Sequence, residues 1–477
     1  MALRRVRASA RAGFEEATAR WRRRAPHGAS LDERELAKLR ERIEACLDPR
    51  LSGVAVRTRA GEVAEVIAGL DRDGLRAFFT MLLASFGPRP EALTGPVAEV
   101  AAAVRAGTEP RLDAIQQLRE ACTPRWETLF ELFCGLAGGV KLAVDLRAEL
   151  LALLPGDPAF APLDSTLHTV LSRLFPPGLL ELRRITWNSP GSLLEKLMEY
   201  EAVHQITSWE DLKNRLDDSD RRCYAFIHPG MADEPLIFVE VALLPEMAAD
   251  VVSLLDVSAP TGIREEATTA IFYSISACQP GLGGVNLGDV LIKEVVADLS
   301  RNLPQLTEFA TLSPLPGFRR WLDRTLANPD SSLLTTDDNK AIAELTPDGA
   351  SGPAALAAVL ATPWPGDAVL SRGLREPLVG LAADYLLGEG HGRSQDRVAN
   401  FHLTNGARVE RLNWLANPSP AGLRESYGLM VNYRYDLPKI DAHHEQYVAH
   451  GEITRSSSIG RLVTGRRKSR AARAESP

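Results

Sequence analysis

The stretch "SISACQPGLGGVNLGDVLIKEVVADL", residues 274–299, reads as a β-strand that ends in a glycine-rich turn and continues as a helix. The turn holds four glycines within eight residues: Gly281, Gly283, Gly284 and Gly288. Glycines let the backbone approach another group closely and point its N–H groups outward, and the helix adds the positive end of its dipole. The pattern therefore predicts a phosphate site. Simple chain reversal is the alternative that this stretch leaves open.

Two familiar nucleotide motifs do not occur in this turn. No Lys-Ser or Lys-Thr pair follows the glycines, as it does in the phosphate-binding loop of ATPases and GTPases. The glycine spacing also differs from the Gly-x-Gly-x-x-Gly of dinucleotide-binding domains. The sequence therefore gives no support for ATP or NAD as the phosphate-bearing ligand.

The composition is that of a globular protein with two or three domains. The chain has 477 residues, of which 45% are hydrophobic and 25% are charged. Its formal net charge of -7 argues against nucleic acid as the main partner. The five cysteines are scattered and form no Cys-x-x-Cys pair, which indicates a reducing compartment without structural zinc. They are Cys46, Cys122, Cys134, Cys223 and Cys278.

The ends of the chain are rich in basic residues. The first 25 residues have the Arg and Ala content of a mitochondrial transit peptide, but Glu15 and Glu16 argue against one, and a solvated amphipathic helix is expected. Residues 461–477 are predicted to be a basic, disordered tail. No apolar run reaches the roughly 18 residues of a membrane-spanning helix, so no membrane partner is expected.

The sequence changes character near residue 187. Residues 1–187 place apolar residues three or four apart, which predicts a helical bundle for packing and subunit association. Residues 188–460 alternate strand-like runs with helical stretches, which predicts an α+β domain with a helical insertion from about 320 to 398. The strand-like runs are "CYAFIH", "LIFVEVALL", "TAIFYSIS", "EFATLS", "ANFHL" and "YGLMVNYRY".

Three polar side chains near predicted strand ends are candidates for chemistry. Ser313 precedes a turn stiffened by Pro314 and Pro316, and it is either a catalytic hydroxyl or a helix cap. His402 is expected on a strand, on the face opposite its apolar neighbours, where structural histidines are more frequent than catalytic ones. Tyr435 is an ordinary strand residue unless it lies beside His402. No His-x-x-x-His pair or acidic cluster has metal-ligand spacing, so no metal is expected.

Taken together, five segments of the second half resemble the malonyl-CoA decarboxylase family. In chain order they are "HPGMADEPLIFVEVALL", "IFYSISACQPGLGGVNLGDVLIKEVV", "TLSPLPGFRRWL", "NFHLTNGARVERLNWLA" and "YGLMVNYRY". They extend over about residues 228–435. The N-terminal half resembles the helical domain of the family in character and length.

The resemblance implies a catalytic domain of the N-acetyltransferase (GNAT) superfamily, in which a glycine-rich loop holds the pyrophosphate of coenzyme A at a helix N-terminus. It implies coenzyme A contacts at Ser276, Gln279, Gly281, Leu282, Gly283, Gly284, Val285 and Gly288. It implies catalytic positions at His402, Ser313, Tyr435 and Asn286. Family members can carry Glu at the position of Asn286, so an acidic role is lost there, while a hydrogen bond is not.

The implied reaction converts malonyl-CoA to acetyl-CoA and carbon dioxide. The thioester carbonyl accepts the electrons that carbon dioxide leaves behind, so neither an organic cofactor nor a metal is expected. His402 titrates in the right range to protonate C2. Ser313 and Tyr435 are the candidates to orient the carboxylate or the enolate.

Two other functions stay open. The first alternative to a decarboxylase is an acyltransferase that uses coenzyme A, which is the common use of the GNAT fold. The second alternative is a non-catalytic scaffold that binds coenzyme A. Ser313 and His402 in the matching motifs count against the scaffold. The resemblance also implies a homo-oligomer, a dimer or tetramer, built through the helical domain. The Ala- and Arg-rich composition favours a cytoplasmic location, with the mitochondrial matrix as the lesser alternative.

Overall fold

The structure is a computed structural model that describes residues 30–259, 261–328, 331–388 and 392–474. The expected N-terminal amphipathic helix lies outside the described residues. The described chain forms two compact units. The first contains the chain up to Glu181 together with Phe226–Ile237 and Ala277–Leu287, and the second contains the remainder. Two short segments that follow the N-terminal helices in the sequence therefore belong to the same unit as those helices.

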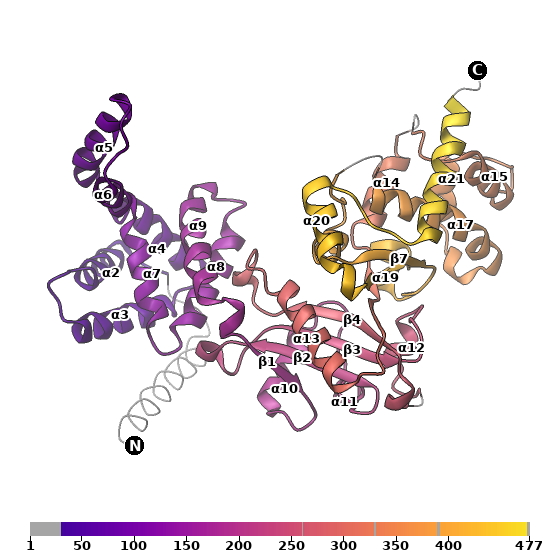
Figure 1. Cartoon of the computed structure of the whole chain (residues 1–477), viewed down its shortest axis with the longest axis horizontal. Coiled ribbons are helices and arrows are strands. Elements are labelled where there is room, and N and C mark those ends of the chain that lie inside the picture. The colour runs from indigo at the N-terminus through magenta and orange to yellow at the C-terminus, as the bar shows by residue number, and fades with distance from the viewer. Residues whose placement is uncertain (1–29, 260, 329–330, 389–391, 475–477) are drawn as a thin grey trace. The chain divides into compact units, whose positions relative to one another are not determined.

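Amphipathic helices build the first unit (Figure 1). They are α2 (Glu33–Cys46), α3 (Gly53–Ile67), α4 (Arg72–Ser85), α5 (Pro90–Arg105), α6 (Leu112–Cys122), α7 (Arg125–Cys134), α8 (Gly139–Leu153) and α9 (Ala161–Leu174). Short 3-10 turns η1 (Pro158–Phe160) and η2 (Pro177–Leu179) follow α8 and α9. The apolar residues of α4, α7 and α8, spaced three or four apart, are buried against neighbouring helices. The predicted helical region is therefore confirmed.

Helices α5 and α6 form a hairpin that extends from the other helices of this unit (Figure 1). Helix α5 has no buried residue, and α6 has only Ala114. Four large apolar side chains of the hairpin are exposed by 44% or more: Val97, Val104, Leu112 and Ile115. The hairpin therefore has an apolar surface that no other part of the described chain covers.

Within the described residues, eight strands form one mixed sheet. They are β1 (Glu181–Ile185), β2 (Arg221–Ile227), β3 (Pro235–Leu244), β4 (Thr269–Ala277), β5 (Glu308–Thr311), β6 (Ser313–Pro314), β7 (Arg408–Asn413) and β8 (Met430–Tyr435). The order is β1-β2-β3-β4-β5-β8-β6, with β7 also paired to β8. Strands β4 and β5 are parallel and are connected through helix α13 (Gly288–Asn302), whereas β5, β6 and β7 pair with β8 in antiparallel fashion.

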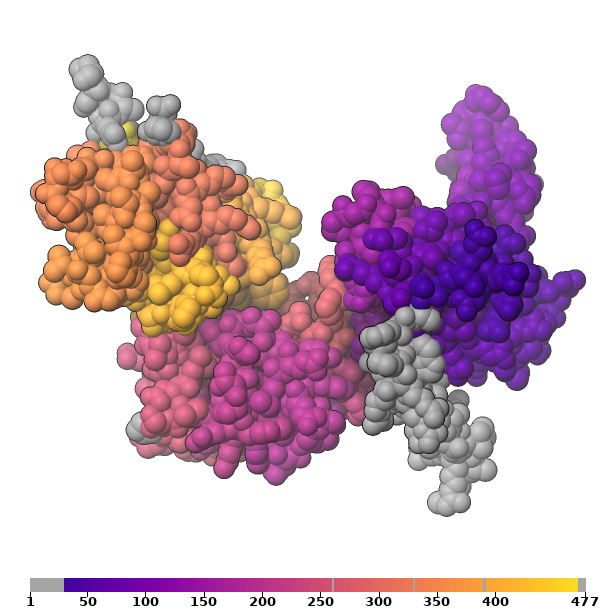
Figure 2. Space-filling view, turned by 180° about the vertical axis from the view of Figure 1, so that it is seen from behind, coloured from indigo at the N-terminus to yellow at the C-terminus, as the bar shows by residue number. Residues whose placement is uncertain are grey.

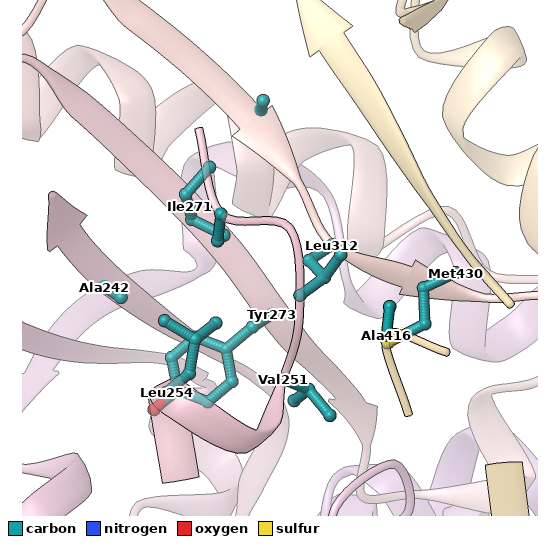
Figure 3. Close-up of a cluster of buried hydrophobic side chains, with 10 residues drawn as sticks. Ala242, Val251, Leu254, Ile271, Tyr273, Leu312, Ala416 and Met430 are labelled. Atoms are coloured by element: carbon teal, nitrogen blue, oxygen red, sulfur yellow. The ribbon is translucent and has the colours of Figure 1, made fainter. Parts of the chain in front are cut away.

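Strand β8 is the element that positions the candidate catalytic residues. Its last residue, Tyr435, pairs with Phe309 of β5, and its second residue, Val431, pairs with Ser313 of β6. Leu312, between β5 and β6, is fully buried in a hydrophobic cluster with side chains of β3, β4 and β8 (Figure 3). Because this core fixes the short break between β5 and β6, it also fixes where Ser313 stands.

Helices cover the rest of the second unit. They are α10 (Gly191–Tyr200), α11 (Trp209–Arg215), α12 (Val252–Leu255), α14 (Phe318–Leu326), α15 (Thr336–Leu345), α16 (Pro353–Leu360), α17 (Ala368–Leu387), α18 (Arg397–Thr404), α19 (Pro420–Ser426), α20 (Ile440–His450) and α21 (Ser457–Ala474). Helices α14–α17 occupy the predicted helical insertion. The α+β class, with a helical region followed by a mixed-sheet domain, is thus confirmed. None of the described helices is long and apolar enough to cross a membrane.

The predicted disordered tail is wrong for most of its length, since residues up to Ala474 lie in α21. Arg466 of this helix is buried and donates hydrogen bonds to Asp338 at 2.9 Å and to Asp384 at 2.7 Å. The space-filling view shows the yellow C-terminal segment lying against the orange helices of the same unit (Figure 2). Charges that indicated disorder in the sequence are therefore paired with carboxylates more than 80 residues away in the chain.

Candidate active site

Ser313, His402 and Tyr435 meet in the second unit through direct hydrogen bonds. Ser313 Oγ lies 3.0 Å from His402 Nε2, and Tyr435 Oη lies 2.9 Å from His402 Nδ1. Ser313 Oγ also donates to Thr311 Oγ1 at 2.8 Å. The distances fit a continuous chain in which Tyr435 donates to Nδ1, Nε2–H donates to Ser313, and Ser313 donates to Thr311. Sequence reasoning named three of these four residues and missed Thr311.

The three predicted residues of this hydrogen-bonded chain are all buried. Their exposed fractions are 6% for Ser313, 2% for His402 and 3% for Tyr435. Burial lowers the pKa of His402 to about 3, so its imidazole is neutral at neutral pH. This corrects the expectation that His402 titrates in the ordinary range. Burial also raises the pKa of Tyr435, and the nearby carboxylate of Asp289 raises it further.

His402 lies on helix α18 and not on the predicted strand. Asp396 begins this helix, because its carboxylate accepts hydrogen bonds from the N–H groups of Val398 and Ala399 at 2.9 and 3.0 Å. His402 stands in the last turn, where its ring stacks on that of Tyr433 at 4.6 Å between centroids. The apolar run around His402 indicated a strand because the capping aspartate lies outside that run.

The turn after Ser313 is tied to the start of α18. A Cβ added at Gly317 would overlap the hydroxyl of Tyr385, and that hydroxyl donates to Asp396 at 3.0 Å. Gly317 therefore leaves room for the tyrosine that holds the capping aspartate. This contact links the segment of Ser313 to the helix that carries His402.

A pocket of about 280 Å³ lies beside Tyr435. Its lining is formed by Asp289, Ile292, Lys293, Val296, Ala297, Ser300, Asn405, Tyr435, Leu437 and Ile440. Asn405 is 5% exposed, and within the described residues its Nδ2 has no hydrogen-bond partner. A buried, unpartnered donor beside a candidate catalytic tyrosine is suited to bind a substrate oxygen. Sequence reasoning missed this role, since the Asn-Gly pair at 405–406 indicates only a turn.

The glycine-rich loop belongs to the first unit as far as Leu287. Residues Pro280–Leu282 form the 3-10 turn η5, and Leu282 is buried. The side chain of Gln279 is buried and donates to the carbonyl of Pro235 at 3.0 Å. Gly283 and Gly284 are exposed, and Gly284 has a φ of +83°, a conformation that favours glycine.

The other predicted site residues lie in the last part of this loop and on either side of it. Val285 is half-buried and donates its N–H to the carbonyl of Leu282, while Asn286 is exposed. Gly288 is buried and is the first residue of α13, in the second unit. Ser276, also in the second unit, donates to the buried carboxylate of Glu201 at 3.1 Å. Asn286 is not among the residues that hydrogen-bond His402 in the described structure, and its predicted role stays a prediction.

The structure describes no cluster of three or more histidine, cysteine, aspartate or glutamate side chains that could hold a metal ion. The site described above contains hydroxyl, imidazole and amide groups. Such a set can orient a carboxylate, donate hydrogen bonds to an enolate oxygen and move a proton.

Comparisons with known proteins identify the family of this chain. The model of the malonyl-CoA decarboxylase C-terminal domain matches residues 178–473, and that of the N-terminal domain matches residues 86–175. Mitochondrial malonyl-CoA decarboxylase from Anser anser anser is 38% identical over 426 residues, which cover 85% of this chain and 83% of that protein. The protein of the same name from Rattus norvegicus is 40% identical over 365 residues, or 74% of each chain.

Solved structures give the same result. Malonyl-CoA decarboxylase from Rhodopseudomonas palustris is 38% identical with a TM-score of 0.80, and the match covers 89% of this chain and 99% of that one. The enzyme from Agrobacterium vitis is 35% identical with a TM-score of 0.81 and the same coverage. Both domains and most of the length are thus shared, and the chain belongs to the malonyl-CoA decarboxylase family.

Proposed function

We propose that this chain decarboxylates malonyl-CoA to acetyl-CoA and carbon dioxide in the buried site around His402. The observation that carries the proposal is the hydrogen-bonded chain in which His402 lies 3.0 Å from Ser313 and 2.9 Å from Tyr435. Family membership supplies the substrate, and this geometry supplies groups of the kind that its decarboxylation needs.

The reaction consumes one proton. The bond between C2 and the carboxylate carbon breaks, its electrons move into the thioester carbonyl, and C2 of the resulting enolate takes a proton. Ser313 hydrogen-bonds the carboxylate or the enolate oxygen, and Tyr435 holds the ring of His402 in place. Protein groups perform every step of this scheme, so we expect neither a metal nor an organic cofactor.

His402 can donate a proton only as an imidazolium, and this charged form needs a negative charge nearby that the site lacks before substrate binds. With a pKa of about 3, His402 is neutral before substrate binds. The malonyl carboxylate brings a negative charge into this buried site, and an opposite charge nearby favours the imidazolium form. His402 therefore takes up a proton as malonyl-CoA binds and gives that proton to C2. The pKa that governs kcat then belongs to the complex and not to the free protein.

The glycine-rich loop holds the other end of the substrate in this proposal. The exposed backbone of Gly283 and Gly284 lets the pyrophosphate of coenzyme A approach closely, and the N–H of Gly284, which has no partner among the described residues, binds it. Asn286 keeps the catalytic role that the family resemblance implies, in which its amide supplies a hydrogen bond. The side chains of Gln279 and Leu282 are buried, and they stabilise the conformation of the loop.

Assembly and location complete the proposal. The chain forms a homo-oligomer, a dimer or tetramer, through its helical region, and the exposed apolar residues of α5 and α6 support this. We place the protein in the cytoplasm. The relatives named above from Anser anser anser and Rattus norvegicus are mitochondrial enzymes, which keeps the matrix as the alternative.

Carboxyl-labelled malonyl-CoA tests the activity. The purified chain, given this substrate without any acyl acceptor, should release labelled carbon dioxide and acetyl-CoA in equal amounts. Acetylation that occurs only when an amine or hydroxyl acceptor is added would instead identify an acyltransferase. Binding of coenzyme A without turnover would identify a scaffold.

A further inference from the structure

Arg147 connects the helical bundle to the glycine-rich loop within the first unit. It lies on α8 and is 4% exposed. Its Nη1 donates to the carbonyl of Gly281 at 2.8 Å and to the carbonyl of Gly283 at 2.7 Å. Its Nε donates to the carboxylate of Asp164 on α9 at 2.8 Å. One buried guanidinium therefore holds two carbonyl groups of the loop and is itself held by a neighbouring helix.

Helix α8 also explains one of the glycines. A Cβ added at Gly281 would overlap the carbonyl oxygen of Val144 and would lie 3.1 Å from the amide nitrogen of Ala148. The loop can therefore reach α8, and with it Arg147, only because residue 281 has no side chain. In this structure Gly281 thus allows close packing of the loop against α8.

The hydrogen bond to Gly283 fixes the direction of one peptide group. A trans peptide is planar, so its C=O and N–H groups point in opposite directions. Because the carbonyl of Gly283 points at Arg147, the N–H of Gly284 points away from it. The N–H groups of Leu282, Gly283 and Val285 donate to carbonyls inside the turn, whereas that of Gly284 has no partner within the described residues. The exposed Gly284 therefore presents an unused donor.

We propose that Arg147 is a positioning residue for phosphate binding: it holds the loop so that the Gly284 N–H faces a phosphate of coenzyme A. The inference deepens the proposed function and rests on its assignment of the loop to the pyrophosphate. It also gives the helical bundle a part in substrate binding in addition to subunit association. Arg147 has no contact with the reacting atoms in this account, so its loss affects binding of the nucleotide part and not the chemistry.

Two substrates separate these effects. Malonyl-CoA contains the pyrophosphate, whereas malonyl-pantetheine ends before it and keeps the same thioester. Steady-state kinetics are measured on both for the wild-type chain, for Arg147→Met and for Arg147→Lys. Lysine retains the charge beside Asp164, but its single ammonium lacks the planar fork that reaches the two carbonyls and the carboxylate together. Arg173→Met is the matched control, since Arg173 lies on α9 and pairs with Glu127 away from the loop.

The Arg147→Met variant should raise KM for malonyl-CoA on the order of 10-fold or more, with kcat little changed. Its kcat/KM for malonyl-pantetheine should stay within about twofold of wild type. The KM of Arg147→Lys for malonyl-CoA should fall between those of wild type and Arg147→Met. Arg173→Met should match wild type on both substrates. Calorimetry with free coenzyme A should show the same loss of affinity for Arg147→Met, independently of any activity.

Several results would overturn the inference. Equal losses on both substrates in a folded variant identify a general structural role for Arg147, and unchanged kinetics and calorimetry identify no role. If Arg147→Met does not fold by circular dichroism, Arg147→Lys decides by the same two comparisons. A wild-type chain that binds coenzyme A but releases no carbon dioxide contradicts the proposed function alone, because calorimetry still tests Arg147. A wild-type chain that uses both substrates equally well contradicts the loop assignment and this inference together.

Discussion

At the scale of single residues, the environment of His402 changes the behaviour expected of a histidine. A histidine in solution titrates near pH 6.5, whereas burial lowers the pKa of His402 to about 3. Ser313 and Tyr435 occupy its two ring nitrogens. The cost of burying the ring is thus offset by hydrogen bonds to its neutral form, and the imidazolium needs a new negative charge in the site.

This difference predicts acid sensitivity of the folded chain. As the pH falls below about 6.5 the unfolded chain binds a proton at residue 402, while the folded chain does so only near pH 3. The free energy of unfolding should therefore decrease over this range, with His402 contributing up to a few kcal/mol. Part of that dependence should disappear in His402→Asn.

Urea unfolding at pH 7, 6, 5 and 4 measures the effect. The difference in free energy of unfolding between wild type and His402→Asn should shift in favour of the variant as the pH falls. His204, whose pKa burial lowers to about 4, is present in both proteins and cancels from the comparison. A difference that is constant with pH would contradict a neutral, buried His402.

At the scale of elements, strands with clear alternation could be predicted from the sequence, whereas contacts between distant segments could not. The runs at 235–244 and 269–277 are strands, as predicted, because both are buried β-branched and aromatic segments. The short strands β1 and β7 were missed, since charged residues interrupt them. The sequence predicts a strand where α18 lies, because eight residues are too few to display a helical period.

The candidate site was predictable by residue and not by arrangement. Motifs named Ser313, His402 and Tyr435, but only the fold brings together groups 89 and 33 residues apart. Arg147 contacts Gly281 across 134 residues, and no local pattern marks such a pairing. The role of Gly281 was likewise hidden, because its neighbour is the backbone of another helix.

Gly317 gives a prediction at this scale. In Gly317→Ala the new methyl group displaces the Tyr385 hydroxyl, which then loses its hydrogen bond to Asp396 at the start of α18. The substitution should lower stability by about 1–3 kcal/mol and reduce kcat as well. Gly366→Ala is the matched control, because a Cβ there has no neighbour within 4 Å.

A double-mutant cycle with Tyr385→Phe identifies the cause. Removing the hydroxyl removes the overlapping atom, so Gly317→Ala should cost less in the Phe background than in the wild-type chain. Urea titrations of the four proteins provide the comparison. Equal costs in the two backgrounds would show that Gly317 is required for another reason.

At the scale of the whole molecule, the first compact unit combines the N-terminal helices with two segments from the sheet-forming part of the sequence. Residues 226–237 and 277–287 pack with the N-terminal helices, so removing those helices would also expose the loop. The role of the helical region in assembly is therefore better tested by substitution than by truncation.

The apolar hairpin of α5 and α6 offers such a test. Leu112 is 85% exposed and Val104 is 64% exposed, so changing both to Asp should leave the fold intact and place charge in the proposed subunit contact. Light scattering should then report a smaller assembly than that of the wild-type chain. Val54→Asp on α3, at a residue 79% exposed, is the control. An unchanged subunit number would exclude this hairpin from the contact.

The turnover of His402→Asn tests the central claim most directly. A positioned proton donor contributes about 10²- to 10⁴-fold, so kcat for release of labelled carbon dioxide should fall by that order, with affinity for free coenzyme A nearly unchanged. Ser313→Ala, which keeps the imidazole, should be slower than wild type but retain its pH dependence of kcat. A folded His402→Asn chain that turns over malonyl-CoA at near wild-type rate would contradict His402 as the proton donor and leave it a structural histidine.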